Sequence, residues 1–292
     1  MNGTIKSIAG SIQLLRKAVA MGASAAALLI LAAPAQADLI TNGGFESTTN
    51  GPGQLGYNTN ATDWTVAPGG YTFLYAPGTA DTSSAPIGQY GVNPLWGPAS
   101  PADGAGPTAS DMPAASPDGG NFVALDGDFQ IAALSQTIND LIAGDQYTVG
   151  FYWAAAQQWN FDGPTVQAMN VCLGSSLESY NVLNTGSEQL SGGTNASSNL
   201  NCNGSGASTP TVSLPSHGFS GWEYETVNLT ANSPTEVLSF LAYGNVQVPP
   251  FALLDGVTMD PTPTPEPATL PLLVTGLMGG LSILRSRKWL KR

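Results

Sequence analysis

The stretch from Tyr147 to Trp153 reads Tyr-Thr-Val-Gly-Phe-Tyr-Trp and carries the clearest strand pattern of this chain. Its odd-numbered positions are all large apolar residues, and its even-numbered positions include Thr and Gly. Because successive side chains of a β-strand point to opposite faces, this alternation places the large residues on one face. The pattern therefore predicts a strand with one face buried in a core.

On both sides of this stretch, further short runs of apolar or alternating residues are bounded by turn-forming residues, and each run is predicted to be a strand. They cover residues 121–125, 131–138, 166–173, 223–229, 236–243 and 251–259. No long segment repeats its apolar residues with the period of a helix. Residues 38–260 are thus predicted to form a single all-β sandwich, and their number is ordinary for such a domain.

Two stretches interrupt these runs and are predicted to be irregular. Residues 77–120 are dense in Pro, Gly, Ala and Ser, and residues 184–210 are rich in Asn, Ser and Gly. A loop as long as the first of these, inside a compact domain, is typically either functional or mobile.

The N-terminal residues are typical of a secretory signal peptide. Lys6, Arg16 and Lys17 precede an apolar run at 18–33, and Ala35-Gln-Ala37 offers a small-x-small cleavage site. We therefore expect residues 1–37 to be a signal peptide and the mature chain to begin at Asp38. The alternative is a transmembrane anchor, which the short, Ala-rich run makes less suitable.

The C-terminal residues predict a membrane segment. Residues 261–267 are a Pro-rich linker, residues 268–284 carry no charge, and residues 285–292 include five Lys and Arg side chains. An uncharged run of this length is at the short end of what a helix needs to cross about 30 Å of hydrocarbon. The basic cluster predicts a cytoplasmic tail, with everything before the helix on the other side of the membrane.

Charge is distributed very unevenly along the chain. All eight Lys and Arg residues lie in the two ends, at positions 6, 16, 17, 285, 287, 288, 291 and 292. All 20 Asp and Glu residues lie between Asp38 and Leu284, where His217 is the one residue able to become cationic. Such a domain repels nucleic acid and anionic lipid surfaces. Its natural counter-ions outside a cell are divalent cations, Ca²⁺ above all, although a plainly soluble acidic surface explains the composition equally well.

The C-terminal segment resembles a known sorting signal. Pro265-Glu266-Pro267, a short apolar helix and a terminal Arg/Lys cluster occur in the order of the PEP-CTERM signal of Gram-negative bacteria. The resemblance implies a partner, the membrane protease and transpeptidase called exosortase, and processing near the motif. It also implies tethering to the inner membrane before processing, and then a place on the cell surface or in the extracellular matrix. The alternative is an ordinary C-terminal anchor.

The mature chain resembles a second family in four segments. They are Leu-Ile-Thr-Asn-Gly-Gly-Phe-Glu at 39–46, residues 120–127, residues 134–138 and residues 251–257. Their order and spacing are similar to those of galactose-binding-like β-sandwich domains, which include carbohydrate-binding modules. The resemblance implies a jelly-roll sandwich opened by a strand at 39–46. It implies sugar binding, adhesion or a structural role only weakly, because that fold hosts many functions.

The same resemblance implies a calcium site. In related modules, carboxylates from the first and last strands hold Ca²⁺, and Asn42, Glu46 and Asp255 occupy the matching positions here. Calcium takes six to eight oxygen ligands, so Asp126 and backbone carbonyls would have to contribute. The alternative is that these side chains accept hydrogen bonds from backbone N–H groups at strand ends.

Aromatic residues in predicted loops are the candidates for glycan contact, since sugar rings stack their C–H faces on aromatic rings. They are Tyr90, Trp96, Trp159 and Phe161. Trp159 follows the strongest strand, so we expect it at the rim of the sandwich. Trp64, Trp153 and Trp222 lie in strand patterns and are expected in the core. For each loop aromatic, simple packing is the alternative.

Cys172 and Cys202 are the two cysteines of the chain. In an oxidising compartment they are expected to form a disulfide that closes the Asn- and Ser-rich stretch, with two free thiols as the alternative.

Catalytic motifs are absent from the sequence. His217-Gly-Phe-Ser220-Gly does not match a nucleophile elbow, and the chain has too few Cys and His residues for a zinc site. The carboxylate pairs Asp126/Asp128 and Glu223/Glu225 are the kind that acidic composition produces by itself. We therefore expect no enzymatic activity. The main hypothesis is an exported structural or adhesive protein of the surface or exopolysaccharide matrix; the alternative is a carbohydrate-binding module with structural calcium.

Overall fold

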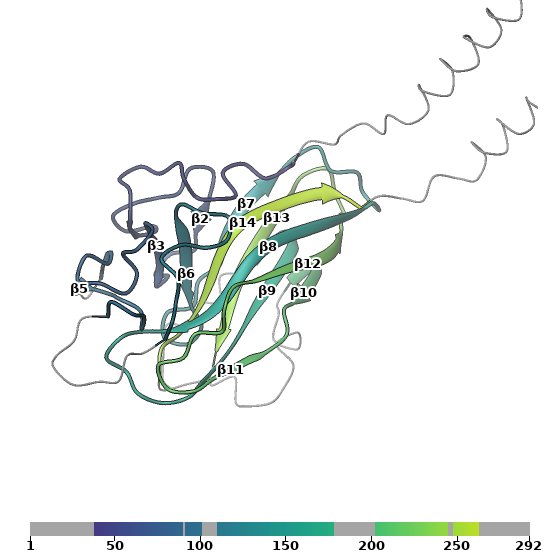
Figure 1. The fold of residues 1–292 in the computed structure, drawn as a ribbon. Helices are drawn as coiled ribbons and strands as arrows, with labels where there is room; N and C mark the ends of the chain where they lie inside the picture. Colours follow the sequence, from purple (N-terminus) through teal and green to yellow (C-terminus); the bar gives the residue numbers. More distant parts are fainter. Residues whose placement is uncertain (1–37, 90, 101–109, 178–201, 245–247, 263–292) are drawn as a thin grey trace, which may run out of the picture. The chain divides into compact units, whose positions relative to one another are not determined.

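The computed structural model describes residues 38–89, 91–100, 110–177, 202–244 and 248–262 (Figure 1). This part of the chain consists of strands, turns and bends, so the all-β prediction is confirmed. It includes no helix long and apolar enough to span a membrane. The expected signal peptide at 1–37, the PEP motif at 265–267 and the membrane helix at 268–284 lie outside the described residues.

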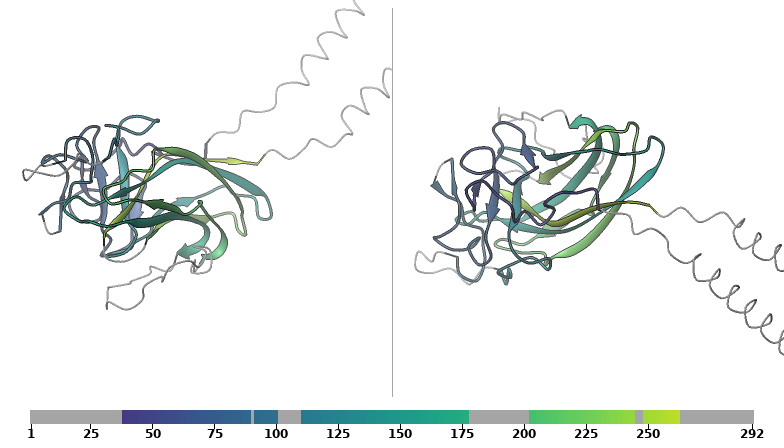
Figure 2. Two further views of the ribbon diagram at one scale, coloured as in Figure 1. Left: turned by 60° about the horizontal axis from the view of Figure 1, so that its bottom comes forward. Right: turned by 90° about the horizontal axis from the view of Figure 1, so that it is seen from above.

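Two antiparallel sheets form the two layers of the sandwich (Figures 1 and 2). The first contains, in spatial order, β1 (Gly53–Gln54), β3 (Thr72–Tyr75), β6 (Phe122–Asp126), β14 (Pro250–Pro261), β8 (Gln146–Gln157) and β12 (Glu223–Thr230). The second contains β10 (Cys202–Ser208), β9 (Thr165–Leu177), β13 (Glu236–Gly244), β7 (Leu134–Ile138) and β2 (Thr65–Val66), and β11 (Val212–Leu214) also pairs with β9. A small separate hairpin joins β4 (Ile87–Gly88) to β5 (Gly91–Val92).

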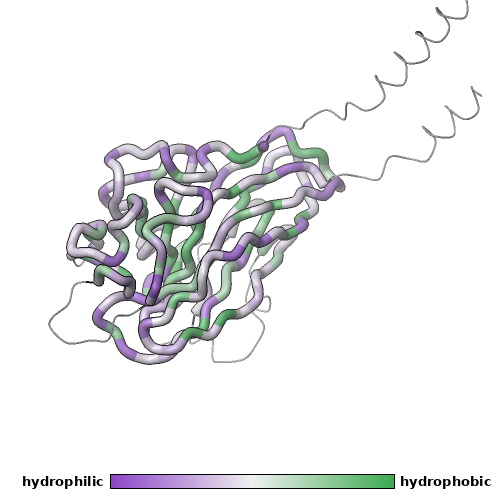
Figure 3. The backbone as a smooth tube through the Cα atoms, viewed as in Figure 1, coloured by the Kyte–Doolittle hydropathy of each residue, from purple (hydrophilic) through white to green (hydrophobic). Residues whose placement is uncertain are grey.

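The main core lies between the two sheets and is built by alternation along the long strands (Figure 3). Val149, Phe151 and Trp153 on β8 are all buried there, as the sequence pattern predicts. Phe151 meets Phe240 of β13 edge to face, with 5.3 Å between the ring centroids. Aromatic pairs of this geometry contribute about 0.5–1.5 kcal/mol beyond the area that they bury.

A second core lies on the outer face of the first sheet. Phe73 of β3, Phe122 of β6 and Phe251 of β14 point away from the main core, and each has an exposed fraction of 1% or less. Leu95 and Met112, both from the Pro- and Gly-rich stretch 77–120, pack on them. The described residues of that stretch are thus the cover of a buried sheet face, a packing role that the sequence reading did not assign.

The opening segment 39–46 corrects the resemblance-based expectation of a strand. Asn42 and Phe45 have φ angles of 55° and 57°, in the left-handed region that a strand does not use. The segment nevertheless docks on the last strand, because Leu39 N–H donates to Met259 O at 3.0 Å and Val257 N–H donates to Gly43 O at 3.1 Å. A Cβ at Gly43 would collide with the Val257 carbonyl, so this approach requires glycine.

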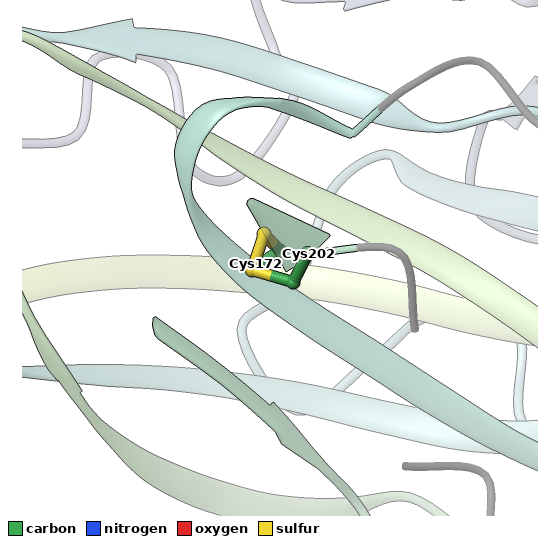
Figure 4. Close-up of a disulfide and its surroundings, with 2 residues drawn as sticks. All are labelled: Cys172 and Cys202. Atoms are coloured by element: carbon green, nitrogen blue, oxygen red, sulfur yellow. A yellow bond between two sulfur atoms is a disulfide. The ribbon is translucent and has the colours of Figure 1, made fainter. Parts of the chain in front are cut away.

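Strand β10 corrects a second expectation, since Cys202–Ser208 lies within the stretch predicted to be irregular. It pairs with β9, and the predicted disulfide between Cys172 and Cys202 fixes its start, with a Cα–Cα distance of 5.7 Å (Figure 4). A bridge that closes a loop of this length contributes about 3–4 kcal/mol by restricting the unfolded chain.

The described chain begins and ends at the same end of the sandwich (Figure 1). Met259 N–H donates to the Asp38 carboxylate at 2.9 Å, and Thr262 N–H donates to the Gln146 carbonyl at 2.8 Å. Gln146 is the first residue of β8, and Gln157 is its last. The loops that follow Gln157 are therefore on the order of 35 Å from the chain ends, at about 3.3 Å per residue.

Candidate functional site

Predicted aromatic residues gather at the rim formed where β8 ends. Residues 158–164 follow β8 and carry Trp159 and Phe161. The segment that carries Trp96 docks beside them, because Trp96 N–H donates to Gln157 O at 2.9 Å and Trp159 N–H donates to Pro94 O at 3.0 Å. Two segments that are distant in sequence are thereby held side by side. Trp159 lies at the rim, as its position after the strongest strand predicts.

The side chains at this rim form a connected group. The rings of Trp96 and Trp159 are tilted by 55°, with 6.3 Å between centroids. Trp96 Nε1–H donates to the Phe161 carbonyl at 3.0 Å, and Phe161 keeps 39% of its surface exposed. The structure thus brings together three of the four predicted glycan-contacting residues; Tyr90 lies outside the described residues. We call Trp96, Trp159 and Phe161 the aromatic rim.

His217 also joins the aromatic rim, a role that the sequence patterns did not assign to it. Its ring stacks on Trp96, with 3.9 Å between centroids and an interplanar angle of 26°. Its Nε2 lies 2.5 Å from Asp162 Oδ1. His217 has a φ of 64°, an uncommon conformation for a residue other than glycine. The signal available in the sequence was that no other residue of the acidic domain can become cationic.

The buried Gln157 side chain ties the loops of the rim together. Its Nε2 donates to Thr165 Oγ1 at 2.7 Å and to the Pro215 carbonyl at 3.1 Å. Its Oε1 accepts from the His217 backbone N–H at 2.6 Å. Because a buried amide with several satisfied hydrogen bonds fixes the groups around it, the rim is positioned by the end of β8 itself.

This arrangement is suited to holding a ligand that has both apolar faces and hydroxyl groups. The partly exposed indoles and the Phe161 ring offer apolar surface, and the Asp162 side chain, which is 85% exposed, offers acceptor oxygens. Sugars combine C–H faces with hydroxyls, so they match both features. A site of this kind binds by surface contact and needs no group that changes covalently.

The other three tryptophans among the described residues lie largely where the pattern places them. Trp64 and Trp153 are buried in the main core. Trp222 is half-buried and meets Phe122 edge to face at 5.6 Å, on the margin of the second core.

A second group of polar residues gathers where the opening segment meets the last strand. Asp255 is fully buried, and its Oδ2 accepts a hydrogen bond from the Ser116 hydroxyl. Its Oδ1 is buried with no hydrogen-bond partner. Burial raises the pKa of Asp255 to about 7, and the nearby carboxylates of Asp118 and Glu46 act in the same direction. Two predicted calcium ligands, Glu46 and Asp255, are thus neighbours.

The remaining two predicted calcium ligands are engaged elsewhere. Asn42 uses its carboxamide to bind Ser47 and the Thr62 carbonyl, which closes a turn. Asp126 accepts the backbone N–H groups of residues 128, 129 and 130, as expected for an Asp-Gly-Asp turn. Because Asp126 pairs with Phe251 in the sheet, it lies about 13 Å along β14 from Asp255.

The structure therefore fits a calcium site only in part. The orphaned Asp255 oxygen and the two neighbouring carboxylates favour a cation, but Glu46 Oε1 already accepts the Asn121 N–H at 2.6 Å. The described ranges contain no cluster of three or more His, Cys, Asp or Glu side chains arranged to hold a metal ion.

No protein-family model and no curated protein matches the chain. Among solved structures, TmCBM61 in complex with beta-1,4-galactotriose is 12% identical, with 77% of this chain and 99% of that chain covered and a TM-score of 0.34. A CBM4 structure is 16% identical, with 76% and 99% covered and a TM-score of 0.32. The K1 cleaved adhesin domain of Lys-gingipain from Porphyromonas gingivalis W83 is 14% identical, with 75% and 96% covered and a TM-score of 0.36. Likeness at these TM-scores carries no argument about a ligand.

The buried state of Asp255 predicts how stability depends on pH. An aspartate of the unfolded chain ionises near a pKa of about 3.9, whereas folded Asp255 keeps its proton until about pH 7. Between these values the unfolded state alone loses the proton, so the unfolding free energy should fall as pH rises, by on the order of 1.4 kcal/mol per pH unit. Asp255→Asn should reduce this slope in urea unfolding measured in EDTA.

Some slope should remain in Asp255→Asn, because burial also raises the pKa of Asp126, to about 6. Asp145→Asn, at an exposed turn, is the matched control and should keep the full slope of the wild type. Equal slopes in the Asp255 variant and the wild type would contradict the assignment of the buried proton.

Proposed function

We propose that the domain is an exported glycan-binding module, with a jelly-roll, galactose-binding-like arrangement of its sandwich, and that it contacts its ligand at the aromatic rim. The observation that carries this proposal is the convergence of Trp96, Trp159 and Phe161 with the His217–Asp162 pair. Three loops from distant parts of the sequence supply one exposed group of rings and polar atoms. Phe161 keeps 39% of its surface exposed, so part of this group is accessible to a ligand.

The charge of the domain selects the class of ligand. It contains no Lys or Arg between Asp38 and Leu284, so an acidic polysaccharide would meet repulsion with no compensating ion pair. A neutral glycan meets no such penalty and can stack on the rings. The role that we propose is binding, because the aromatic rim offers ring surface and acceptor oxygens, which are the groups that contact with a neutral sugar requires.

Substitution at the rim should weaken glycan binding. Trp159→Ala or Trp96→Ala removes a ring that stacks on sugar, and we expect binding about tenfold weaker or worse on an array of neutral oligosaccharides. Tyr57→Ala, which removes a ring that is 67% exposed on a distant turn, is the control and should bind as the wild type does. A wild-type protein that binds no glycan on the array would overturn the proposal.

A structural calcium ion is the second part of the proposal, and the buried, unpartnered Oδ1 of Asp255 is what favours it. Glu46 and Asp255 would hold the ion, which would neutralise carboxylates that repel one another. The thermal midpoint should then rise by several degrees with Ca²⁺ relative to EDTA, and Glu46→Ala and Asp255→Ala should reduce that rise. No difference between Ca²⁺ and EDTA in the wild type would remove this part.

Export and sorting form the third part, which rests on the sequence of the two ends and is favoured by the disulfide. We propose that the signal peptide is removed, and that the Pro265-Glu266-Pro267 signal directs processing by an exosortase and release to the cell surface or the extracellular matrix. Mass spectrometry of the exported protein should find a chain that lacks both ends. An intact C-terminus on the mature protein would contradict it.

A further inference from the structure

Part of the outer face of the first sheet is open to solvent. The stretch 77–120 covers the half formed by β3, β6 and the beginning of β14. The other half consists of the beginning of β8, the end of β14 and the edge strand β12. Its outward positions include Tyr152, Tyr224, several threonine and asparagine side chains, and the exposed carboxylate of Asp260, which pairs with Thr148. We call this surface the tyrosine face.

The rings of Tyr152 and Tyr224 pack close to the backbone of the sheet, because the residues beneath them, Gly256 and Gly150, have no side chains. A Cβ on Gly150 would collide with the Tyr224 hydroxyl, and one on Gly256 would lie 3.0 Å from Tyr152 Cδ2. The two rings meet edge to face, with 5.0 Å between centroids and an interplanar angle of 61°. Tyr224 nevertheless keeps 54% of its surface exposed. The side of its ring that faces away from Gly150 is thus open.

Hydroxyl and amide groups continue this surface along the strands. Thr148 Oγ1 lies 2.9 Å from Asn228 Oδ1 on β12 and 3.0 Å from Thr262 Oγ1 beyond the end of β14. Thr258 Oγ1 donates to the Gly150 carbonyl at 3.4 Å. The surface therefore offers neutral hydrogen-bonding groups beside an open ring, and the Asp260 carboxylate adds a further acceptor for sugar hydroxyls.

A protein partner or a second copy fits this surface poorly. Protein interfaces of standard size bury about 800 Å² on each side around an apolar core, whereas the tyrosine face has two rings among polar side chains. A second copy would also bring together two domains that carry only acidic formal charge, which repel each other. A neutral polysaccharide, which needs one open ring and nearby hydrogen-bonding groups, matches what is present.

We propose that the tyrosine face is a second binding surface of this protein, for a neutral polysaccharide, with Tyr224 as the stacking platform and Gly150 as the residue that holds its ring flat. It is separate from the aromatic rim. Tyr152 and Trp159 are seven positions apart on one continuous strand and its loop, about 23 Å at the spacing of a β-strand. Substitutions at the two surfaces should therefore act independently.

The test is native gel electrophoresis of the full-length protein, purified in detergent, through gels that contain β-1,4-galactan, xylan or mixed-linkage glucan. Retardation of the wild type by a neutral polymer reports binding, and alginate, an acidic polymer, should not retard it. Tyr224→Ala should weaken retention about tenfold. Tyr224→Phe should retain most of it, because the ring remains. Tyr57→Ala, another exposed tyrosine, should migrate as the wild type does.

Gly150→Ala provides an independent variant. The added methyl group would displace the Tyr224 ring from the sheet, while the tyrosine side chain itself is unchanged. This variant should weaken retention as Tyr224→Ala does. Because an aromatic ring over a strand glycine also stabilises a sheet, thermal midpoints are measured for every variant. A Tyr224→Ala protein that is less stable but is retained as strongly as the wild type would overturn the proposal and leave the tyrosine with a structural role.

Trp159→Ala in the same gels separates this inference from the proposed function. Loss of retention in Trp159→Ala but not in Tyr224→Ala refutes the tyrosine face and supports the aromatic rim. The reverse result supports the tyrosine face and refutes the rim. Loss in both variants supports two surfaces, and a wild type that no neutral polymer retards refutes both.

Discussion

The pairing of β14 with β8 is the constraint on which the rest of the structure depends. The two strands stay paired from Pro250 opposite Gln157 to Pro261 opposite Tyr147, interrupted by one irregularity after Asp255. Over the half nearest Pro250, both faces of this pair are buried, one in the main core and the other in the second core. The second sheet can cover one of these faces only. A further layer is therefore required, and the stretch 77–120 supplies it.

The candidate site is a consequence of that cover. Leu95 is fully buried in the second core, and the next residue, Trp96, reaches the rim. The apolar contact of one residue thus fixes the position of its neighbour. Gln157 completes the arrangement, because it is the last residue of β8 and its side chain binds the loops on either side. The position of the aromatic rim therefore follows from the packing of Leu95 in the second core and from the hydrogen bonds of Gln157 at the end of β8.

Sequence patterns predicted the long strands well because each buries one large apolar face, and alternation of residues reports that burial directly. They failed for β10, where Gly, Ser and Asn leave no alternation and where pairing depends on β9 and the disulfide. The expectation of a strand at 39–46 came from resemblance, and there positive φ angles and docking on β14 give a bend in its place. In each case the deciding partner is distant along the chain, so no local pattern could report it.

For the site, too, local sequence predicted where a residue lies, and the contacts between distant segments were missed. Trp159 was placed correctly at the rim, because its position after β8 is a local property. The role of His217 was missed, since its contacts with Trp96 and Asp162 bring together segments far apart in sequence. Asn42 was expected beside Glu46 and Asp255 from resemblance, and Asp126 was added because calcium needs more oxygen ligands. In the structure, local turns engage both of these side chains. Motif position alone does not determine which oxygen atoms remain available.

The first and last described residues lie at the end of the sandwich opposite the aromatic rim, and this placement has a mechanical consequence. Suppose that a force acts between two points, the C-terminal end of β14 and a ligand bound at the loop after β8. This force would be directed along the two strands. The ladder hydrogen bonds between β14 and β8 lie perpendicular to that direction. They would be loaded in shear and would share the force, whereas a pull across the sheet would open them one after another. The fold therefore suits a domain that is held at one end and drawn from the other.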